Sequence, residues 1–362
     1  MLPIQDNFAE IFLSGAPLMD TRAPVEFARG SFPGAVNRPL MTDDERAAVG
    51  TCYKQQGQEA AIELGHRLVS GAIKAHRIAA WADFARQHPE GYLFCFRGGL
   101  RSQIVQRWLA EEAGVVYPRV AGGYKAMRQF LMQTTERLAI SIPIRVIGGM
   151  TGTGKTELLQ RLAGMLDLEA CANHRGSGFG RRVHPQPAQI DFEHRIATRL
   201  LALEAAGSSA AIVEDEGNFI GRCSVPAVLF DQMQAAPLLW LEDCFENRVQ
   251  RILQDYVIDQ RADHDAVYGD EGAARFSAHL RDSLFRIRKR LGGERYVRAQ
   301  ALMQEALDMQ ETTGYAEGHW AWIELLLREY YDPMYVHQKA QKQHRIVACG
   351  DADTLARFVI KF

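Results

Sequence analysis

The sequence predicts an α/β protein made of two domains, each built on a parallel sheet. At 362 residues the chain is longer than one ordinary domain of about 100–200 residues, so two domains are expected. An apolar strand, a glycine-rich loop and a helical pattern follow one another twice, at residues 91–113 and again at residues 144–166. Repetition of this order is typical of parallel strands covered by helices.

The expected domains are residues 1–138 and 144–362, joined by a linker at residues 139–143. In the first domain, Thr42 is followed by acidic residues and is predicted to cap a long helix that runs to about Gln87. In the second domain, the charged pattern from about residue 272 to residue 340 predicts a basic, helical segment.

The composition is that of a globular protein with an ordinary core. Hydrophobic residues make up 47% and charged residues 24% of the chain, and the formal net charge is −2, so overall charge does not indicate a nucleic-acid binder. The six cysteines form no CxxC pair, which argues against a zinc site or a disulfide framework. The first residues do not resemble a signal peptide, and no run reaches the roughly 18 apolar residues of a membrane span. We therefore expect a reduced, cytoplasmic enzyme without a membrane partner.

A phosphate-binding loop is predicted at residues 149–156, where Gly-Met-Thr-Gly-Thr-Gly-Lys-Thr matches the pattern G-x-x-x-x-G-K-[ST]. Backbone N–H groups of such a loop point at phosphate oxygens. The residues expected to bind a diphosphate are Gly149, Gly152, Gly154, Lys155 and Thr156. The motif recognises phosphates rather than a base, so it does not say which diphosphate is bound.

Acidic residues are expected to hold a cation beside this loop. The apolar strand at residues 210–213 ends in Glu214-Asp215-Glu216, the place where P-loop proteins support their metal. The predicted ligands are Thr156, Glu214 and Asp215, and Mg²⁺ is the expected cation because it prefers oxygen ligands.

A second site is predicted at residues 95–102, Cys-Phe-Arg-Gly-Gly-Leu-Arg-Ser. Cys95 lies between an apolar strand and a helix N-terminus, whose N–H dipoles favour the nucleophilic thiolate. Arg97 and Arg101 add positive charge, so these three residues are the catalytic candidates. The spacing C-x5-R is that of cysteine-dependent phosphatases, but a cradle for a tetrahedral anion also serves transfer of sulfur or selenium.

The N-terminal stretch favours sulfur chemistry. Residues 20–27, Asp-Thr-Arg-Ala-Pro-Val-Glu-Phe, and residues 32–37, Phe-Pro-Gly-Ala-Val-Asn, resemble the opening of rhodanese-type sulfurtransferase domains. The resemblance implies a rhodanese-like first domain, fused here to a P-loop NTPase-like domain. The cysteine loop has one residue more before its arginine than the common rhodanese pattern C-x-x-G-x-R, which indicates a bulkier, phosphate-like anion.

The order of these motifs resembles the tRNA 2-selenouridine synthase family. Further segments that carry the resemblance are Tyr53–Gly57, Gly122–Lys125, His174–Ser177 and Tyr330–Tyr335. The resemblance implies that wobble 2-thiouridine in the lysine, glutamate and glutamine tRNAs is converted to 2-selenouridine through an S-geranyl intermediate. It implies geranyl diphosphate and selenophosphate as substrates, with no permanent organic cofactor. Whether Cys95 would carry selenium covalently stays open.

Contacts to tRNA phosphates are expected from a basic stretch of the helical segment, since lysine and arginine neutralise phosphates. The candidates are Arg281, Arg286, Arg288, Lys289 and Arg290.

The main alternative is a P-loop kinase or NTPase with a sulfurtransferase-like or phosphatase-like cysteine domain, which would turn over nucleotide without tRNA. The sequence does not locate a geranyl pocket, because Phe179, Phe219 and Trp240 are equally expected in the core.

Overall fold

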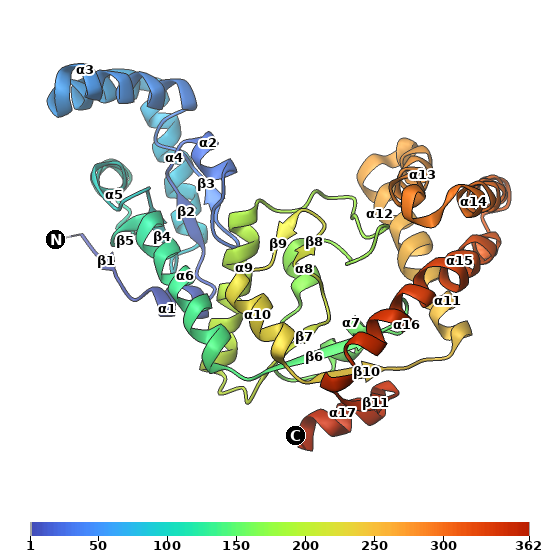
Figure 1. The fold of residues 1–362 in the computed structure, drawn as a ribbon. Coiled ribbons are helices and arrows are strands. Elements are labelled where there is room, and N and C mark those ends of the chain that lie inside the picture. Colours follow the sequence, from blue (N-terminus) through green and yellow to red (C-terminus); the bar gives the residue numbers. More distant parts are fainter. Residues whose placement is uncertain (1, 362) are drawn as a thin grey trace. The chain divides into compact units, whose positions relative to one another are not determined.

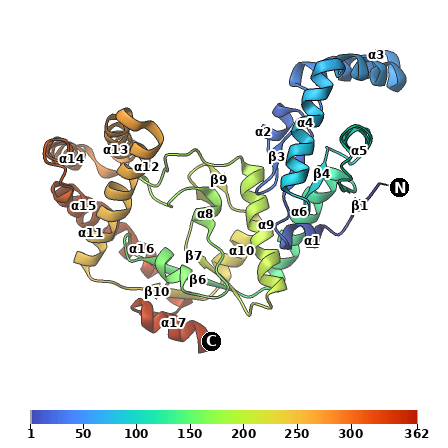
Figure 2. The same ribbon diagram turned by 180° about the vertical axis from the view of Figure 1, so that it is seen from behind.

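The computed structural model describes residues 2–361 and divides into two compact units, whose elements are labelled in Figure 1 and seen from behind in Figure 2. The first unit contains residues 1–138 and 188–206, and the second contains residues 139–187 and 207–362. Both contain a parallel sheet with helices, so the predicted α/β class is confirmed. Within the described residues, no helix combines the length and apolar character needed to cross a membrane.

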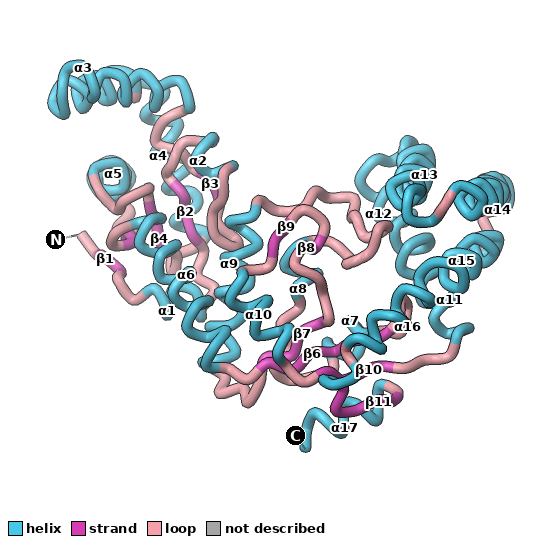
Figure 3. The backbone as a smooth tube through the Cα atoms, viewed as in Figure 1, coloured by secondary structure: helices cyan, strands magenta, loops and turns pink. Residues whose placement is uncertain are grey.

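The first unit has a parallel sheet in the order β1-β5-β4-β2-β3. Its strands are short, whereas several of its helices are long, as Figure 3 shows. The strands are β1 (Ile4–Gln5), β2 (Leu18–Asp20), β3 (Val36–Asn37), β4 (Tyr92–Phe94) and β5 (Arg119–Val120). The helices are α1 (Phe8–Leu13), α2 (Pro24–Ala28), α3 (Asp43–Leu68), α4 (Gly71–Gln87), α5 (Leu100–Ala113), α6 (Gly123–Ser141) and α9 (Gln189–Ala205). Cys95 directly follows β4, at the edge of the sheet where the parallel strands end.

The predicted long helix from Thr42 to about Gln87 is two helices, α3 and α4. Thr42 caps α3 as expected, because its hydroxyl accepts from the Glu45 N–H and its own N–H donates to the Glu45 carboxylate. The helix ends where Val69 leaves the helical conformation and buries its side chain. Within α3, Gly57 has φ 89° and ψ −176°, which kinks the helix.

Helix α9 packs with the first unit, whereas the sequence prediction assigned all of residues 144–362 to the second domain. Its Ala197 and Leu201 lie in one apolar cluster with Phe12, Met127 and Leu131, which explains the difference. The chain therefore passes between the two units three times, after residues 138, 187 and 206.

The second unit has a parallel sheet in the order β11-β10-β6-β7. Its strands are β6 (Ile144–Gly149), β7 (Ala211–Glu214), β10 (Leu238–Leu241) and β11 (Ile346–Gly350), with a separate hairpin of β8 (Phe219–Ile220) and β9 (Cys223–Ser224). The helices around this sheet are α7 (Lys155–Gln160), α8 (Leu168–Ala172), α10 (Ala227–Ala235) and α17 (Ala352–Lys361).

Two local expectations in this region were wrong. Residues 139–141 are the end of α6 rather than part of a linker. Helix α7 ends at Gln160 instead of continuing to residue 166. The chain must turn there, because Gly164 has φ 92° and a Cβ atom on it would lie 2.4 Å from the carbonyl oxygen of Ala210.

The predicted basic segment is helical and forms its own apolar core in the second unit. Phe276, Leu280 and Leu284 of α13 pack in one cluster with Trp322 and Ile323 of α15. The elements are α11 (Phe245–Leu253), the π-helical turn η1 (Gln254–Ile258), α12 (Asp259–Tyr268), η2 (Gly269–Glu271), α13 (Gly272–Leu291), α14 (Gly293–Thr313), η3 (Glu317–His319), α15 (Trp320–Leu326), the π-helical turn η4 (Leu327–Tyr331), α16 (Asp332–Gln341) and η5 (Gln343–Arg345).

Candidate functional site

The loop between β6 and α7 has a backbone that requires its glycines. Gly152 and Gly154 have φ angles of 81° and 82°, in the left-handed region that favours glycine. A Cβ atom on Gly152 would lie 2.7 Å from the carbonyl oxygen of Arg248, and one on Gly149 would lie 2.8 Å from that of Leu241. The loop leads directly into the N-terminus of α7, the geometry that binds phosphate groups.

Lys155 lies at the first position of α7, with its Nζ atom 3.3 Å from the carbonyl oxygens of Gly149 and of Met150. Burial lowers the pKa of its ammonium group, but the electrostatic effect of nearby acidic groups, Tyr335 and Glu214 foremost, outweighs this and raises the pKa. Lys155 is therefore a half-buried cation inside the predicted phosphate cradle.

Three carboxylates meet beside Thr156. Glu169 of α8, Glu214 at the end of β7, and Glu216 have oxygen atoms within 4.8 Å of one another. The Thr156 hydroxyl donates to Glu214 at 2.7 Å. Burial, followed by repulsion within the group, raises the pKa of Glu169 to about 8, of Glu214 to about 8 and of Glu216 to about 7.

The structure brings Thr156 and Glu214 together as predicted but directs Asp215 elsewhere. Both oxygens of Asp215 accept from Lys342 Nζ, at 2.8 and 2.6 Å. Glu169 and Glu216 take part instead; Glu216 belongs to the same acidic run as Asp215, whereas Glu169 lies outside both motifs and no local sequence signal marks it. A divalent cation would relieve the repulsion among the three carboxylates, and these hard oxygen ligands fit the expected Mg²⁺.

A cavity of about 390 Å³ opens over this cradle. Its lining includes Lys155, the three carboxylates and the guanidinium groups of Arg175, Arg182 and Arg251. The positive side chains suit a polyanion such as a diphosphate. An adjoining apolar slot that includes Phe179 has a volume of only about 30 Å³, comparable with the space of one water molecule in the liquid.

The segment Tyr330–Tyr335 supports the P-loop through one partly buried ion pair. Asp332 accepts from Arg248, with oxygen–nitrogen distances of 3.1 and 2.5 Å. Arg248 in turn donates to the carbonyl oxygen of Thr151 at 2.9 Å. This contact gives a structural reason for a motif that lies almost 180 residues after the loop in the sequence.

A second cavity of about 630 Å³ in the same unit is lined by arginine and histidine side chains. The side chains concerned are Arg181, Arg182, Arg222, Arg286, Arg290, His174 and His184. Two of the predicted tRNA contacts, Arg286 and Arg290, are among them. Of the others, Arg281 donates to Gln304, Arg288 stacks over the Phe285 ring at 3.5 Å, and Lys289 does not line the cavity.

The cysteine loop of the first unit rests against a glycine pair. The Tyr124 N–H donates to the Cys95 carbonyl oxygen at 2.9 Å, and a Cβ atom on Gly123 would lie 2.2 Å from that oxygen. Only glycine allows this approach, which accounts for the segment Gly122–Lys125. The Cys95 side chain is 3% exposed, and its sulfur lies 3.2 Å from the Ser102 hydroxyl in the first turns of α5.

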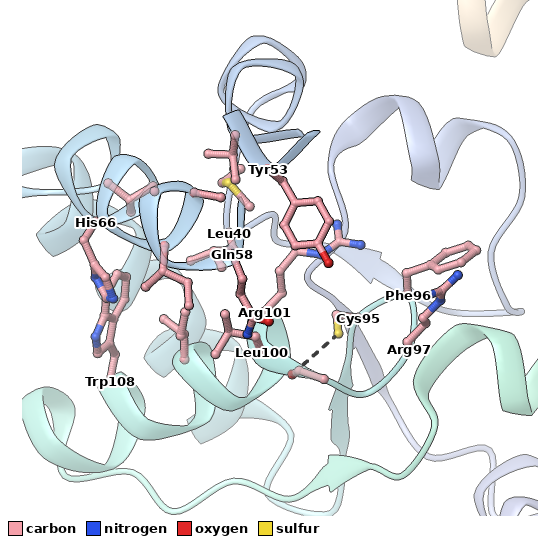
Figure 4. A pocket seen from close by; sticks show the side chains of 18 residues that line it. Leu40, Tyr53, Gln58, His66, Cys95, Phe96, Arg97, Leu100, Arg101 and Trp108 are labelled. Carbon is pink, nitrogen blue, oxygen red and sulfur yellow. Dashed lines mark hydrogen bonds between the residues drawn. The ribbon is translucent and has the colours of Figure 1, made fainter. Parts of the chain in front are cut away.

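The two arginines of the cysteine loop differ in their surroundings. Arg101 is in the first turn of α5 and donates to Glu26 at 2.7 and 3.3 Å. Burial raises the pKa of Glu26, but the hydrogen bonds and the charge of Arg101 outweigh this and lower it. Arg97 is exposed. All three predicted residues, Cys95, Arg97 and Arg101, line one cavity, drawn in Figure 4.

A parallel sheet with a P-loop, and a carboxylate on the neighbouring strand beside the P-loop threonine, define a phosphate-binding P-loop protein. A family model described as the tRNA 2-selenouridine synthase AAA domain matches residues 142–361. The chain is 57% identical over 353 residues to tRNA 2-selenouridine synthase of Pseudomonas fluorescens, covering 98% of this chain and 96% of that protein. It is 58% identical to the Azotobacter vinelandii protein of that name, with coverage of 98% and 96%, and 60% identical to the Bordetella bronchiseptica one, with coverage of 95% and 94%.

The chain therefore belongs to the tRNA 2-selenouridine synthase family and is an enzyme. A solved N-terminal domain from Clostridium difficile 630, of a protein named for ATP/GTP binding, is 30% identical and covers 32% of this chain and 89% of that chain. Its TM-score of 0.29 is too low to indicate a shared fold.

Proposed function

We propose that this enzyme modifies tRNA, converting wobble 2-thiouridine to 2-selenouridine through S-geranyl-2-thiouridine. Its substrates would be the lysine, glutamate and glutamine tRNAs, geranyl diphosphate and selenophosphate. One structural observation supports the proposed two-step chemistry independently of the names of the relatives. A single chain holds a P-loop cradle for a diphosphate in one unit and a cysteine on an arginine-bearing loop in the other.

The cradle at Lys155 suits the first step. The sulfur of 2-thiouridine attacks the geranyl carbon that bears the diphosphate, a C–S bond forms, and the C–O bond breaks. Diphosphate leaves with the electron pair, and the uridine releases its N3 proton. Lys155 and the loop N–H groups stabilise the charge that develops on the leaving group. Mg²⁺ held by Thr156 and Glu214, with Glu169 and Glu216 beside them, would add positive charge at the same place.

The cysteine loop suits the second step. Alkylation makes the sulfur at C2 a better leaving group, so the selenium of selenophosphate can attack C2. The C2–S bond breaks and geranylthiolate leaves with the electron pair, taking up a proton. Water then cleaves the Se–P bond and releases phosphate and 2-selenouridine. Arg97, Arg101 and the N-terminus of α5 would hold the donor beside Cys95.

The two steps can be separated with two variants of the full-length protein. Lys155→Ala should reduce geranylation of thiolated tRNA by about 100-fold or more, because it removes charge stabilisation of the leaving group, yet still convert tRNA that is already geranylated. Cys95→Ala should accumulate geranylated tRNA and make little 2-selenouridine, because it removes the thiol against which the selenium donor would be held for the second step. Mass spectrometry of the tRNA nucleosides measures both products.

Cys52→Ala is the matched control, since it removes another buried thiol of the first unit and should leave both steps unchanged. The proposal is wrong if Cys95→Ala makes selenouridine from geranylated tRNA at the normal rate, or if Lys155→Ala loses selenation while keeping geranylation. Rapid ATP or GTP turnover without tRNA would favour the alternative of a P-loop kinase or NTPase.

A further inference from the structure

The cavity beside Cys95 has a volume of about 590 Å³, within the range of small-molecule sites. Its walls come from α3, from α5 and from the cysteine loop. In Figure 4, Cys95 lies at the base of the cavity, with Tyr53 of α3 above it and Trp108 of α5 at the far side. The site is thus much larger than an oxyanion donor needs.

The space arises from the sequence of the two helices. The kink at Gly57 divides the α3 part of the lining: Val49 and Tyr53 come before it, and the small residues Ala61 and Gly65, one helical turn apart, come after it. On α5, the facing stripe is Leu100, Ile104 and Trp108 with the same spacing. Protein interiors are normally filled to close packing, so small residues opposite large apolar ones leave room for an apolar guest.

The character of the lining changes along the cavity. Cys95, Arg97 and Arg101 gather at the cysteine loop, whereas Val49, Ile62, Ile104 and Trp108 line the part between the helices. The two large cavities of the second unit, in contrast, are lined mainly by charged and polar side chains. A ligand that matches the cavity at Cys95 has a polar reacting end and an apolar tail.

We propose that this cavity binds the geranyl chain of S-geranyl-2-thiouridine, with the sulfur–C2 bond directed at Cys95. This inference rests on the proposed function, in which geranyl is the one apolar group, and it names the residues that receive that group in the second step. The chain would lie between α3 and α5 while the selenium donor occupies the arginine end. The departing geranylthiolate then already sits in its apolar site, away from the attacking selenium.

The test uses full-length protein, selenophosphate, and anticodon stem-loops that carry S-methyl-, S-dimethylallyl- or S-geranyl-2-thiouridine. The wild-type protein should prefer geranyl over methyl by about 100-fold or more in kcat/KM, because each buried methylene contributes about fourfold. Ala61→Phe fills the cavity and should reduce this preference at least tenfold, mainly through KM, while the methyl substrate changes little. Ile104→Ser, which replaces an apolar wall without overfilling, should act in the same direction.

Ala60→Phe is the matched control, since the same substitution on the neighbouring residue of α3 lies outside the lining and should keep the geranyl preference. Activity on the S-methyl substrate shows that the first unit of each variant is folded, and geranylation of thiolated tRNA shows that the first step is intact. Equal use of methyl and geranyl substrates by the wild-type protein, or an unchanged geranyl preference in both cavity variants, would overturn the inference alone. Failure of the wild-type protein to make selenouridine from any S-alkyl substrate would overturn the proposed function as well.

Discussion

At the scale of single residues, the cation site beside the P-loop depends on which carboxylates actually meet. The sequence predicts Glu214 as a ligand because it ends an apolar strand, and it predicts Thr156 because it closes the P-loop motif. Asp215, the next residue, faces Lys342 instead, because successive residues of an extended chain point in opposite directions. Glu169 enters from α8, through packing between segments that are distant in sequence. A pattern of adjacent residues cannot reveal such a partner.

This difference can be measured with one pair of substitutions. Glu169→Gln should raise the Mg²⁺ concentration needed for half-maximal geranylation by about 10- to 100-fold, since it removes one charge from the cluster. Asp215→Asn should leave that concentration roughly unchanged, because Asp215 is paired with Lys342. A magnesium titration of both variants decides between the two residues. If Asp215→Asn raises the required Mg²⁺ concentration and Glu169→Gln does not, Asp215 rather than Glu169 is the ligand.

At the scale of helices and strands, locally encoded features were predictable and their ends were not. The Thr42 cap, the strand before Cys95, the P-loop and the basic helices all follow from short patterns and are present. The break between α3 and α4 was missed, because Val69 leaves the helix to bury its side chain in the core. The early end of α7 was missed for a similar reason, since Gly164 must approach the backbone of Ala210. Tertiary packing decides both positions.

The basic residues that were predicted to contact tRNA lie on different sides of helix α13. Five basic residues were candidates for tRNA contact, but only Arg286 and Arg290 line the arginine-rich cavity. Arg290→Gln should therefore weaken tRNA binding and lower the slope of log affinity against log salt by about one, because one phosphate contact is lost. Arg288→Gln is the matched control on the same helix, since Arg288 stacks over Phe285. Filter binding at several salt concentrations measures both.

If both variants weaken tRNA binding equally, the basic stretch attracts tRNA through its summed positive charge rather than through contacts in the cavity. Binding of geranyl diphosphate should be unaffected in either case, because neither Arg288 nor Arg290 lines the cavity over the P-loop.

At the scale of the whole molecule, the two units are not consecutive in sequence. Helix α9 lies between the P-loop helix and β7 along the chain, yet it belongs to the unit that carries Cys95. Its contacts there are specific: the Ser31 N–H donates to Asp191 at 2.7 Å, and Arg128 donates to Glu193 at 3.0 Å. A domain prediction based on motif order alone places one boundary in the chain. It cannot detect that a later segment, residues 188–206, returns to the first unit.

This connection predicts that residues 1–138 do not form a complete folding unit. Without α9, the apolar surface formed by Phe12, Met127 and Leu131 loses its cover from Ala197 and Leu201, and exposing a patch of this kind favours unfolding and association. The fragment 1–138 should bind a hydrophobic dye and unfold at lower urea than the same fragment with residues 188–206 attached by a flexible linker. Urea titration followed by circular dichroism compares the two. Equal urea midpoints of the two fragments would mean that residues 1–138 fold stably without α9. A lower midpoint for the fragment without α9 would mean that the unit carrying Cys95 needs α9 for its stability.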